Sequence, residues 1–292
     1  MNGVIVINKP VGKTSHDCVS FIRRLLRIKR VGHTGTLDPL ASGVLPICVG
    51  SATKASELLT CENKAYRAEL ILGMTTDTLD SEGDVLTEQP VLCTKEQIYS
   101  AVMSFVGEQE QLPPMYSAIK KDGKKLYELA RQGISIEREK RRINIYGIDI
   151  IDIDLERGSV KIDVECSKGT YIRSLCEDIG MRLGCGAYMN SLERTRSGRF
   201  SIEKSFTLGQ LEALLEQNRM SEAFIPVDEL FPYPKITVDD RQRHFIVNGV
   251  RTRFMGLCEG ERYRVYDRDG CFLCISVCME QRLTLEKAFW NS

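Results

Sequence analysis

The sequence has no excess charge of either sign, because 40 lysines and arginines balance 40 aspartates and glutamates. A net charge of zero excludes an overall polycation, so any contact with nucleic acid has to come from local clusters of basic residues. Long apolar runs are also missing, and the N-terminus has no charged start followed by an apolar signal region. We therefore expect a cytoplasmic protein that does not enter a membrane.

Fingerprints of cofactor-dependent enzymes are absent as well. Gly12-Lys13-Thr14 resembles part of a phosphate-binding loop, but that motif needs a glycine five positions before Gly12, where Ile7 stands. The 11 cysteines, without an export signal, indicate reduced thiols rather than disulfides. Cys271, Cys274 and Cys278 lie in an apolar stretch without a second Cys-x-x-Cys pair, which is typical of a buried strand. We expect no metal and no cofactor.

The most unusual stretch that is present is segment 32–43, with the sequence Gly-His-Thr-Gly-Thr-Leu-Asp-Pro-Leu-Ala-Ser-Gly. Asp38 is its only acidic residue, and residues 1–55 as a whole carry eight cations and two anions. The glycines predict a loop, and Pro39 biases the backbone of Asp38 towards an extended conformation. A carboxylate on such a loop serves as a nucleophile, a general base or a counter-ion, or is simply a solvated acid in an Asp-Pro turn.

Two other residues stand out by their place in a periodic pattern. Residues 64–72 alternate between apolar and polar side chains, which predicts a strand with Tyr66 facing the core. A helix that Thr170 can cap follows later in the chain, and Arg173 falls in its first turn. A cation there opposes the helix dipole by roughly a few tenths of a kcal/mol. This placement is favourable only beside a specific anion, and Asp38 is the candidate.

Basic residues cluster in two regions. Ser15 is a suitable N-cap for a helix whose polar face carries Arg23, Arg24 and Arg27. Residues 116–142 hold nine cations and four anions interleaved with tyrosines, a composition that suits RNA contact. An ordinary solvated surface is the alternative interpretation for both regions.

Segment 32–43 resembles the catalytic motif of the TruB-type tRNA pseudouridine synthases. Three further segments resemble motifs of that family and follow in the expected order. They are Lys-Ala-Tyr-Arg-Ala at 64–68, Gly-Thr-Tyr-Ile-Arg-Ser-Leu at 169–175 and Leu-Glu-Arg-Thr-Arg-Ser-Gly at 192–198. In the last of them Glu193 replaces the family's usual basic residue. The chain is similar to the bacterial, stand-alone members of the family.

The resemblance implies a role for each matching residue. Asp38 corresponds to the catalytic aspartate, Arg173 pairs with it, and Tyr66 stacks on the target base and is a candidate for moving a proton. His33 is a candidate to fill the space that the flipped base vacates, and Leu192 packs beside that base. The remaining residues expected at the RNA are Lys9, Tyr116, Lys120 and Tyr171.

The same resemblance implies an α+β fold, with a mixed, mainly antiparallel central sheet flanked by helices and loops. We expect a catalytic domain over residues 1–230, with an RNA-binding insertion at about 111–142 that grips the T-loop arm. A Pro-dense stretch indicates the domain boundary. Residues 235–292 are expected to form a short PUA-like β-domain on the acceptor side of the tRNA, with short strands at 245–249 and 263–277.

The implied reaction converts a uridine of the tRNA T-loop, U55, into pseudouridine. The N-glycosidic bond breaks, the uracil rotates, and it reattaches through carbon; whether Asp38 attacks the base or the sugar stays open. One alternative is a non-catalytic tRNA-binding folding chaperone, which would not need Asp38. Another is a guide-RNA-dependent, dyskerin-like synthase. We expect a monomer without a required protein partner, because no coiled coil or exposed apolar stripe is evident.

Overall fold

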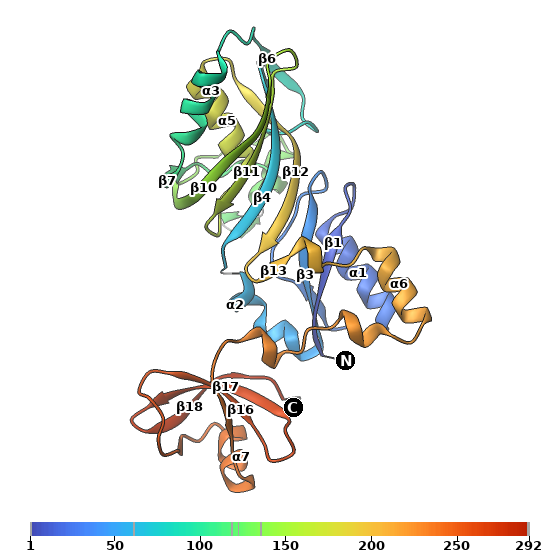
Figure 1. The fold of residues 1–292 in the computed structure, drawn as a ribbon, viewed down its shortest axis with the longest axis vertical. Coiled ribbons are helices and arrows are strands. Elements are labelled where there is room, and N and C mark those ends of the chain that lie inside the picture. Colours follow the sequence, from blue (N-terminus) through green and yellow to red (C-terminus); the bar gives the residue numbers. More distant parts are fainter. Residues whose placement is uncertain (1, 61, 118, 122, 135, 291–292) are drawn as a thin grey trace.

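The computed structural model describes residues 2–290 apart from 61, 118, 122 and 135, and a long twisted sheet runs through most of it (Figure 1). The strands follow the order β1-β3-β12-β4-β11-β10-β7, with β2 paired to β3 and β13 paired to β12. These strands are β1 (Gly3–Lys9), β2 (Val31–His33), β3 (Ser42–Val49), β4 (Lys64–Leu72), β7 (Gly107–Gln111), β10 (Arg141–Asp154), β11 (Ser159–Cys166), β12 (Ala187–Ser197) and β13 (Phe200–Ser201).

Neighbouring strands of this sheet run antiparallel, with the single parallel pairing between β3 and β12. The expected mixed, mainly antiparallel sheet is therefore confirmed. Strand β4 lies in its middle, and the alternation of its sequence matches the burial of its side chains. Tyr66, Ala68 and Leu70 are buried on one face, whereas Arg67 is exposed on the other.

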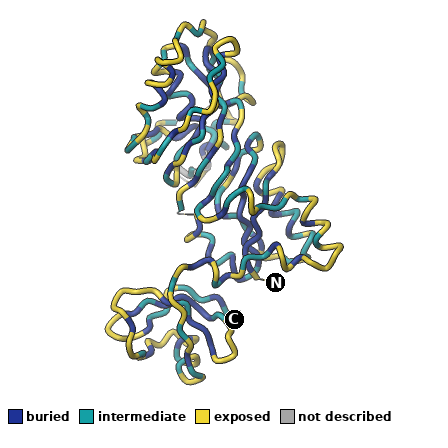
Figure 2. The backbone as a smooth tube through the Cα atoms, viewed as in Figure 1, coloured by how far each residue is buried: buried dark blue, intermediate teal, exposed yellow. Residues whose placement is uncertain are grey.

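Helices cover the face of the sheet to which Tyr66 points. Side chains of α1 (Ser15–Leu26), α3 (Lys95–Met103), α5 (Ile172–Leu183) and α6 (Leu208–Glu216) join the strands in one continuous hydrophobic core. In Figure 1, α3 and α5 lie beside β10 and β11, and α1 and α6 lie beside β1. Figure 2 shows the buried backbone following the strands, with exposed segments at the outer helices and loop tips. No described helix is long and apolar enough to cross a membrane.

Helix α1 is capped by Thr14, and not by Ser15 as the sequence suggested. The Oγ1 of Thr14 accepts a hydrogen bond from the Asp17 N–H at 3.0 Å, and the Asp17 carboxylate accepts one from the Thr14 N–H at 2.8 Å. This capping box satisfies the first amides of the helix. The hydroxyl of Ser15 instead bonds both backbone groups of Leu37, so the start of α1 is tied to the loop that carries Asp38.

The remaining elements of this part are short. They are the hairpin β5 (Met74–Thr76) with β6 (Val85–Glu88), the hairpin β8 (Lys120–Lys121) with β9 (Lys124–Lys125), α2 (Ser56–Thr60), α4 (Leu126–Ala130), and the 3-10 turns η1 (Gly50–Ala55), η2 (Ile202–Lys204), η3 (Met220–Ala223) and η4 (Asp228–Leu230). The β8–β9 hairpin and α4 lie between β7 and β10, within the segment 111–142 that the sequence identified as an insertion.

A second, five-stranded sheet with its own hydrophobic core forms the C-terminal part. Its strands are β14 (Lys235–Thr237), β15 (Thr252–Arg253), β16 (Arg262–Tyr266), β17 (Phe272–Met279) and β18 (Arg282–Ala288). The expected strand at 245–249 is wrong, because α7 (Asp240–Val247) occupies most of that segment. Asp239 caps α7 through a capping box with Gln242, a local signal that outweighs the short apolar run. Cys274 and Cys278 are buried within β17.

The two parts of the molecule share a small apolar core. Phe231, Ile275 and Phe289 pack in one cluster with Val4 and Val44, which lie on the face of β1 and β3 opposite to the helices. The Nζ of Lys54 also donates to the backbone oxygen of Trp290 at 2.9 Å. The C-terminal sheet is thus fixed against the reverse side of β1 and β3, and β3 is the strand that follows the Asp38 loop.

Gly43, near the start of β3, is paired with a strand on each side. Its partners are Lys9 on β1 and Arg194 on β12. Its φ is +101°, and an added Cβ would lie 2.3 Å from the backbone oxygen of Arg194. Only glycine permits this approach of two backbones.

We expect Gly43→Ala to lower the free energy of unfolding by about 3 kcal/mol, because a left-handed conformation and a backbone clash act together. Urea denaturation measures the change. Gly184→Ala is the matched control, since Gly184 has a φ of +77° but nothing within 4 Å of an added Cβ. It should cost about 1 kcal/mol. Equal losses in both variants would contradict the role of close packing at Gly43.

Candidate active site

Asp38 lies on the loop between β2 and β3, within reach of Arg173 on the helix α5. The Ala41 N–H donates to the Asp38 backbone oxygen at 3.1 Å and closes a turn. The preceding residue, Leu37, is 4% exposed and is held by Ser15 at both its N–H and its C=O. The Asp38 side chain is 39% exposed. A rigid support with one open carboxylate is the geometry that a nucleophile or a counter-ion requires.

Arg173 holds that carboxylate from the side of α5. Its Nη2 lies 2.9 Å from Asp38 Oδ2, so the pairing that the sequence predicted is present. Its Nη1 lies 3.4 Å from Asp80 Oδ2, and the side chains of Arg173 and Asp80 are only 7% and 6% exposed. The backbone oxygens of Thr78 and Tyr116 accept further bonds at 3.2 and 2.8 Å. The buried guanidinium therefore has enough partners to offset the cost of its burial.

The start of α5 places Arg173 in the first turn without the cap that we expected. The N-cap is Tyr171, which makes no capping bond with its side chain, and Thr170 bonds Ser167 instead. The amide of Gln111, at the end of β7, replaces the cap. Its Oε1 accepts from the Tyr171 N–H at 2.8 Å, and its Nε2 donates to the Tyr171 oxygen at 3.0 Å. A side chain 60 residues earlier thus fixes the helix end and, with it, Arg173.

Sequence analysis did not identify Asp80 as part of this site. It lies in the turn between β5 and β6, where an acidic residue normally meets solvent. Its Oδ1 is bonded by the Thr78 hydroxyl at 2.5 Å and by the Glu82 N–H at 3.1 Å, which leaves Oδ2 for Arg173. No local pattern signals this role, because contacts with β12, among them the pairing of Asp80 with Met189, bring the turn to the site.

Tyr66 and Leu192 lie on neighbouring strands on the same face. Tyr66 of β4 is opposite Arg194 of β12, and Leu192 is opposite Ala68, so the two side chains are diagonal neighbours. Both are buried in the main core, with Tyr66 8% exposed. Burial raises the pKa of the Tyr66 phenol, while the nearby Arg194 cation acts in the opposite direction. The phenol is therefore protonated near neutral pH.

Arg194 is the second residue that sequence analysis missed. Its side chain is 1% exposed and donates from Nε to the Val44 oxygen at 2.7 Å, and from its two Nη atoms to the oxygens of Gly35 and Thr36 at 3.2 and 3.5 Å. No carboxylate lies within 4.0 Å of it among the described residues. Arg194 thus supports the Asp38 loop through backbone oxygens and keeps an uncompensated charge inside the site.

Lys9 was expected to contact RNA, but the structure places it beneath the loop. It is fully buried, and its Nζ donates to the backbone oxygens of Pro10, Lys13 and Pro39 at 3.0, 2.6 and 3.4 Å. Burial lowers the pKa of its ammonium group. With its three donors committed, Lys9 acts as a support of the Asp38 loop and does not present its charge to a phosphate.

The other residues expected at the RNA surround the site at different depths. Tyr171 and Tyr116 are half-buried beside Arg173, to which Tyr116 contributes its backbone oxygen. Burial raises the pKa of the Tyr171 phenol. The side chain of Lys120, in β8, lies outside the described part of the structure. Three-residue clusters of metal-binding side chains are absent from the described residues.

His33 ends β2 and holds the first turn of the loop. Its Nδ1 accepts a hydrogen bond from the Gly35 N–H at 3.3 Å, which requires this nitrogen to be unprotonated. Burial, and then the charge of Arg194, lower the pKa of His33 from its ordinary value of 6.5. Folding therefore favours the neutral ring.

We expect Arg194→Met to lower the free energy of unfolding by about 3 kcal/mol, because several buried backbone oxygens lose their donor. Arg194→Lys keeps the positive charge but loses the planar set of guanidinium donors. Its free energy of unfolding should therefore lie between those of the wild type and Arg194→Met. Urea unfolding of the three proteins tests the order. Equal free energies of unfolding for Arg194→Met and Arg194→Lys would contradict a role of the hydrogen-bond donors at this position.

The stability contributed by His33 should depend on pH. Because its pKa is lower in the folded than in the unfolded chain, its contribution is complete above pH 6.5 and is lost as the pH falls below that value. We expect His33→Asn, whose Oδ1 accepts from Gly35 without titrating, to lose less stability between pH 7.5 and pH 5. Denaturation at both pH values measures this, and equal losses would contradict it.

Known proteins resemble the chain in sequence. Residues 23–172 match the family described as TruB family pseudouridylate synthase, N-terminal domain, and residues 173–231 match the tRNA pseudouridylate synthase B C-terminal domain. A tRNA pseudouridine synthase B of Clostridium kluyveri is 46% identical over 294 residues, which cover 99% of this chain and 100% of the relative. The protein of the same name from Clostridium acetobutylicum is 49% identical over 98% of this chain and 99% of the relative.

Solved structures agree with this assignment. A chain of a Cbf5-Nop10-Gar1 complex superposes with a TM-score of 0.73 at 27% identity, over 99% of this chain and 85% of the other. A chain of an H/ACA ribonucleoprotein bound to a substrate RNA containing 2'-deoxyuridine superposes with a TM-score of 0.71 at 26% identity, over 99% and 85%. With the sequence matches and the loop geometry, they confirm the expected pseudouridine synthase fold. The chain belongs to the TruB family of pseudouridine synthases.

Proposed function

We propose that this protein converts a uridine of tRNA into pseudouridine, with U55 of the T-loop as the target. The observation that carries the proposal is the open carboxylate of Asp38, held by the buried Arg173 on a loop whose sequence resembles the family's catalytic motif. The family assignment and the relatives named tRNA pseudouridine synthase B support the reaction and the substrate class.

The reaction is an isomerisation, so no atom is gained or lost. The bond from N1 of the uracil to the sugar breaks, a bond from C5 to the same sugar carbon forms, and the proton of C5 leaves while N1 gains one. Asp38 acts as the ionised nucleophile, at the base or at the sugar, and Arg173 keeps it ionised and oriented. The protein's own groups suffice for these steps, and the proposal includes no cofactor.

Tyr66 and its neighbours would receive the base. The ring of Tyr66 stacks on the uracil and Leu192 packs beside it. Tyr66 can accept the C5 proton only as a phenolate. Burial disfavours that form by raising the pKa of the phenol, and the Arg194 cation favours it by acting in the opposite direction. Removing the uridine from a folded arm costs roughly a few kcal/mol, which stacking and backbone contacts offset, and His33 fills the vacated space.

The RNA is gripped by separate parts of the chain. In the proposed division, residues 1–230 form the catalytic domain, and the basic insertion at 111–142 holds the T-arm, with Arg131 placed 5.5 Å from the ring centre of Tyr127. Residues 235–292 form a PUA-like domain that contacts the acceptor side. The protein works in the cytosol as a monomer without a protein partner.

Two other functions remain as alternatives. The relatives named tRNA pseudouridine synthase B are 46% and 49% identical, against 26% and 27% for the chains of the solved ribonucleoproteins, which favours tRNA over guide-RNA recognition. A tRNA folding chaperone would use the same basic surfaces but would not need the Asp38–Arg173 pair.

The decisive experiment uses an unmodified tRNA transcript labelled with tritium at uridine C5. We expect the wild type to release the label, and Asp38→Asn to release none while it still binds the RNA. A matched control, Asp163→Asn, removes an exposed carboxylate on the opposite face of the sheet and should leave release unchanged. Tight tRNA binding without any release from the wild type would sink the synthase proposal and favour the chaperone.

A further inference from the structure

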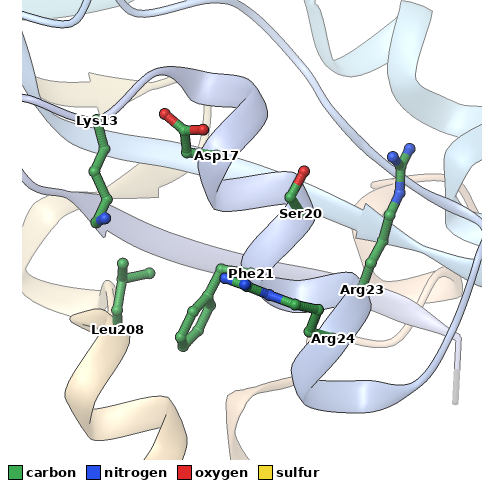
Figure 3. Close-up of a pocket in the computed structure, with 7 residues that line it drawn as sticks. All are labelled: Lys13, Asp17, Ser20, Phe21, Arg23, Arg24 and Leu208. Atoms are coloured by element: carbon green, nitrogen blue, oxygen red, sulfur yellow. The ribbon is translucent and has the colours of Figure 1, made fainter.

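A groove outside the Asp38 site separates α1 from the start of α6. It has a volume of about 460 Å³, and Figure 3 shows the side chains that line it. Lys13 extends into it from one end and Arg24 from the other, and the apolar side chains of Phe21 and Leu208 lie between them. The groove thus combines cations at its ends with an aromatic ring between them.

The one acid of the groove, Asp17, offsets only part of the charge of its three cations, Lys13, Arg23 and Arg24. Asp17 is committed to the capping box, where it accepts from the Thr14 N–H and hydroxyl at 2.8 and 2.7 Å. In the described part of the chain the side chains of Lys13 and Arg24 form no hydrogen bond or ion pair. Arg23 donates once, to the Val31 oxygen at 2.8 Å, and its buried Nε has no partner. Donors and positive charge therefore remain for an anion.

Helix stability alone does not explain this arrangement. Cations in the last turn of α1, such as Arg24, interact favourably with the helix dipole. Lys13 lies before the N-terminus of the same helix, where the dipole disfavours a cation. A ligand with negative charge along the whole groove accounts for both ends.

The groove is joined to the Asp38 loop by direct contacts. The backbone oxygen of Lys13 accepts from Lys9, whose Nζ also lies 3.4 Å from the oxygen of Pro39, next to Asp38. Lys13 precedes α1, and from Ser15 to Arg24 the helix advances by about 14 Å at about 1.5 Å per residue, a length that accommodates more than one phosphate of an RNA strand. An RNA bound at Asp38 can therefore continue into this groove.

We infer that the groove binds an unpaired stretch of the same RNA substrate, with one phosphate at Lys13, another at Arg24, and a base or ribose between them on Phe21. Cations with an adjacent aromatic ring suit single-stranded or looped RNA better than the interior of a duplex, whose bases are stacked inside. This inference rests on the proposed function, since it takes the RNA substrate as the ligand.

The test measures RNA affinity against salt concentration in the Asp38→Asn background, which binds without turnover. We expect Lys13→Gln/Arg24→Gln to reduce the slope of log K against log salt by about 1.4, because each single-strand phosphate contact contributes about 0.7. Affinity should fall on the order of tenfold near 0.1 M salt and converge with the parent protein at high salt. Phe21→Leu should weaken binding with the slope unchanged, because stacking is not ionic.

The control removes the same charge elsewhere. Arg157→Gln/Lys161→Gln removes two exposed cations near the turn between β10 and β11, at the far end of the sheet. It should leave slope and affinity near those of the parent. Equal effects of the two double variants, at equal thermal unfolding midpoints, would overturn the inference, because net charge alone would then explain the loss.

Two more measurements distinguish an RNA contact in the groove from a site for free nucleotides and from a failure of the proposed function. Binding of uridine monophosphate that depends on Lys13 and Arg24, with an unchanged RNA slope, would assign the groove to free nucleotides and overturn an RNA contact. In the active protein, Lys13→Gln/Arg24→Gln should raise KM for the transcript and leave kcat, since Asp38 and Arg173 are untouched. No tritium release from the wild type, with groove-dependent RNA binding intact, would sink the proposed function while supporting the RNA contact.

Discussion

The buried guanidinium of Arg173 is the contact on which the site depends. It joins the Asp38 loop, the turn at Asp80, the backbone of Tyr116 in the insertion and the first turn of α5. A buried charge is stable only when its partners are in place, so these segments, far apart in sequence, have to assemble together. Asp80 satisfies the inner side of the guanidinium, and that leaves the carboxylate of Asp38 oriented by one contact and open on its other side. The position of Asp38 is therefore a property of the whole helix-covered face.

A second arginine holds the same loop in a different manner. Arg173 acts through the side chain of Asp38, whereas Arg194 acts through the backbone oxygens of Gly35 and Thr36. Two carboxylates pair with Arg173, whereas Arg194 donates to backbone oxygens, lies beside the phenol of Tyr66 and has no carboxylate within 4.0 Å among the described residues. A cation therefore lies beside the phenol of Tyr66, where it favours negative charge on that oxygen.

Local sequence patterns and motifs predicted the residues whose positions depend on the neighbouring sequence. The alternation around Tyr66 matches a strand of the central sheet, and the awkward cation at Arg173 correctly indicated an anion, Asp38. What the sequence did not reveal depends on contacts across the fold: a turn that delivers Asp80, a strand register that buries Arg194, and carbonyls that enclose Lys9. These partners are backbone groups or side chains far away in the sequence. The alternation of apolar and polar residues therefore does not indicate them. The catalytic roles and the domain limits stay predictions.

The distribution of charge explains how a chain of zero net charge can serve RNA. On the face of the sheet away from the helices, cations are matched by neighbours across the strands, as in the pair Arg67–Asp163 at 2.8 Å and the pair Arg196–Glu165. On the helix side, Arg194 and the groove cations Lys13 and Arg24 lack such partners in the described chain. Ion pairs across the strands and unpaired cations at the groove thus distribute charge unevenly over a chain whose net charge is zero. An approaching polyanion therefore gains more from the unpaired cations at the groove than from the paired cations on the strands.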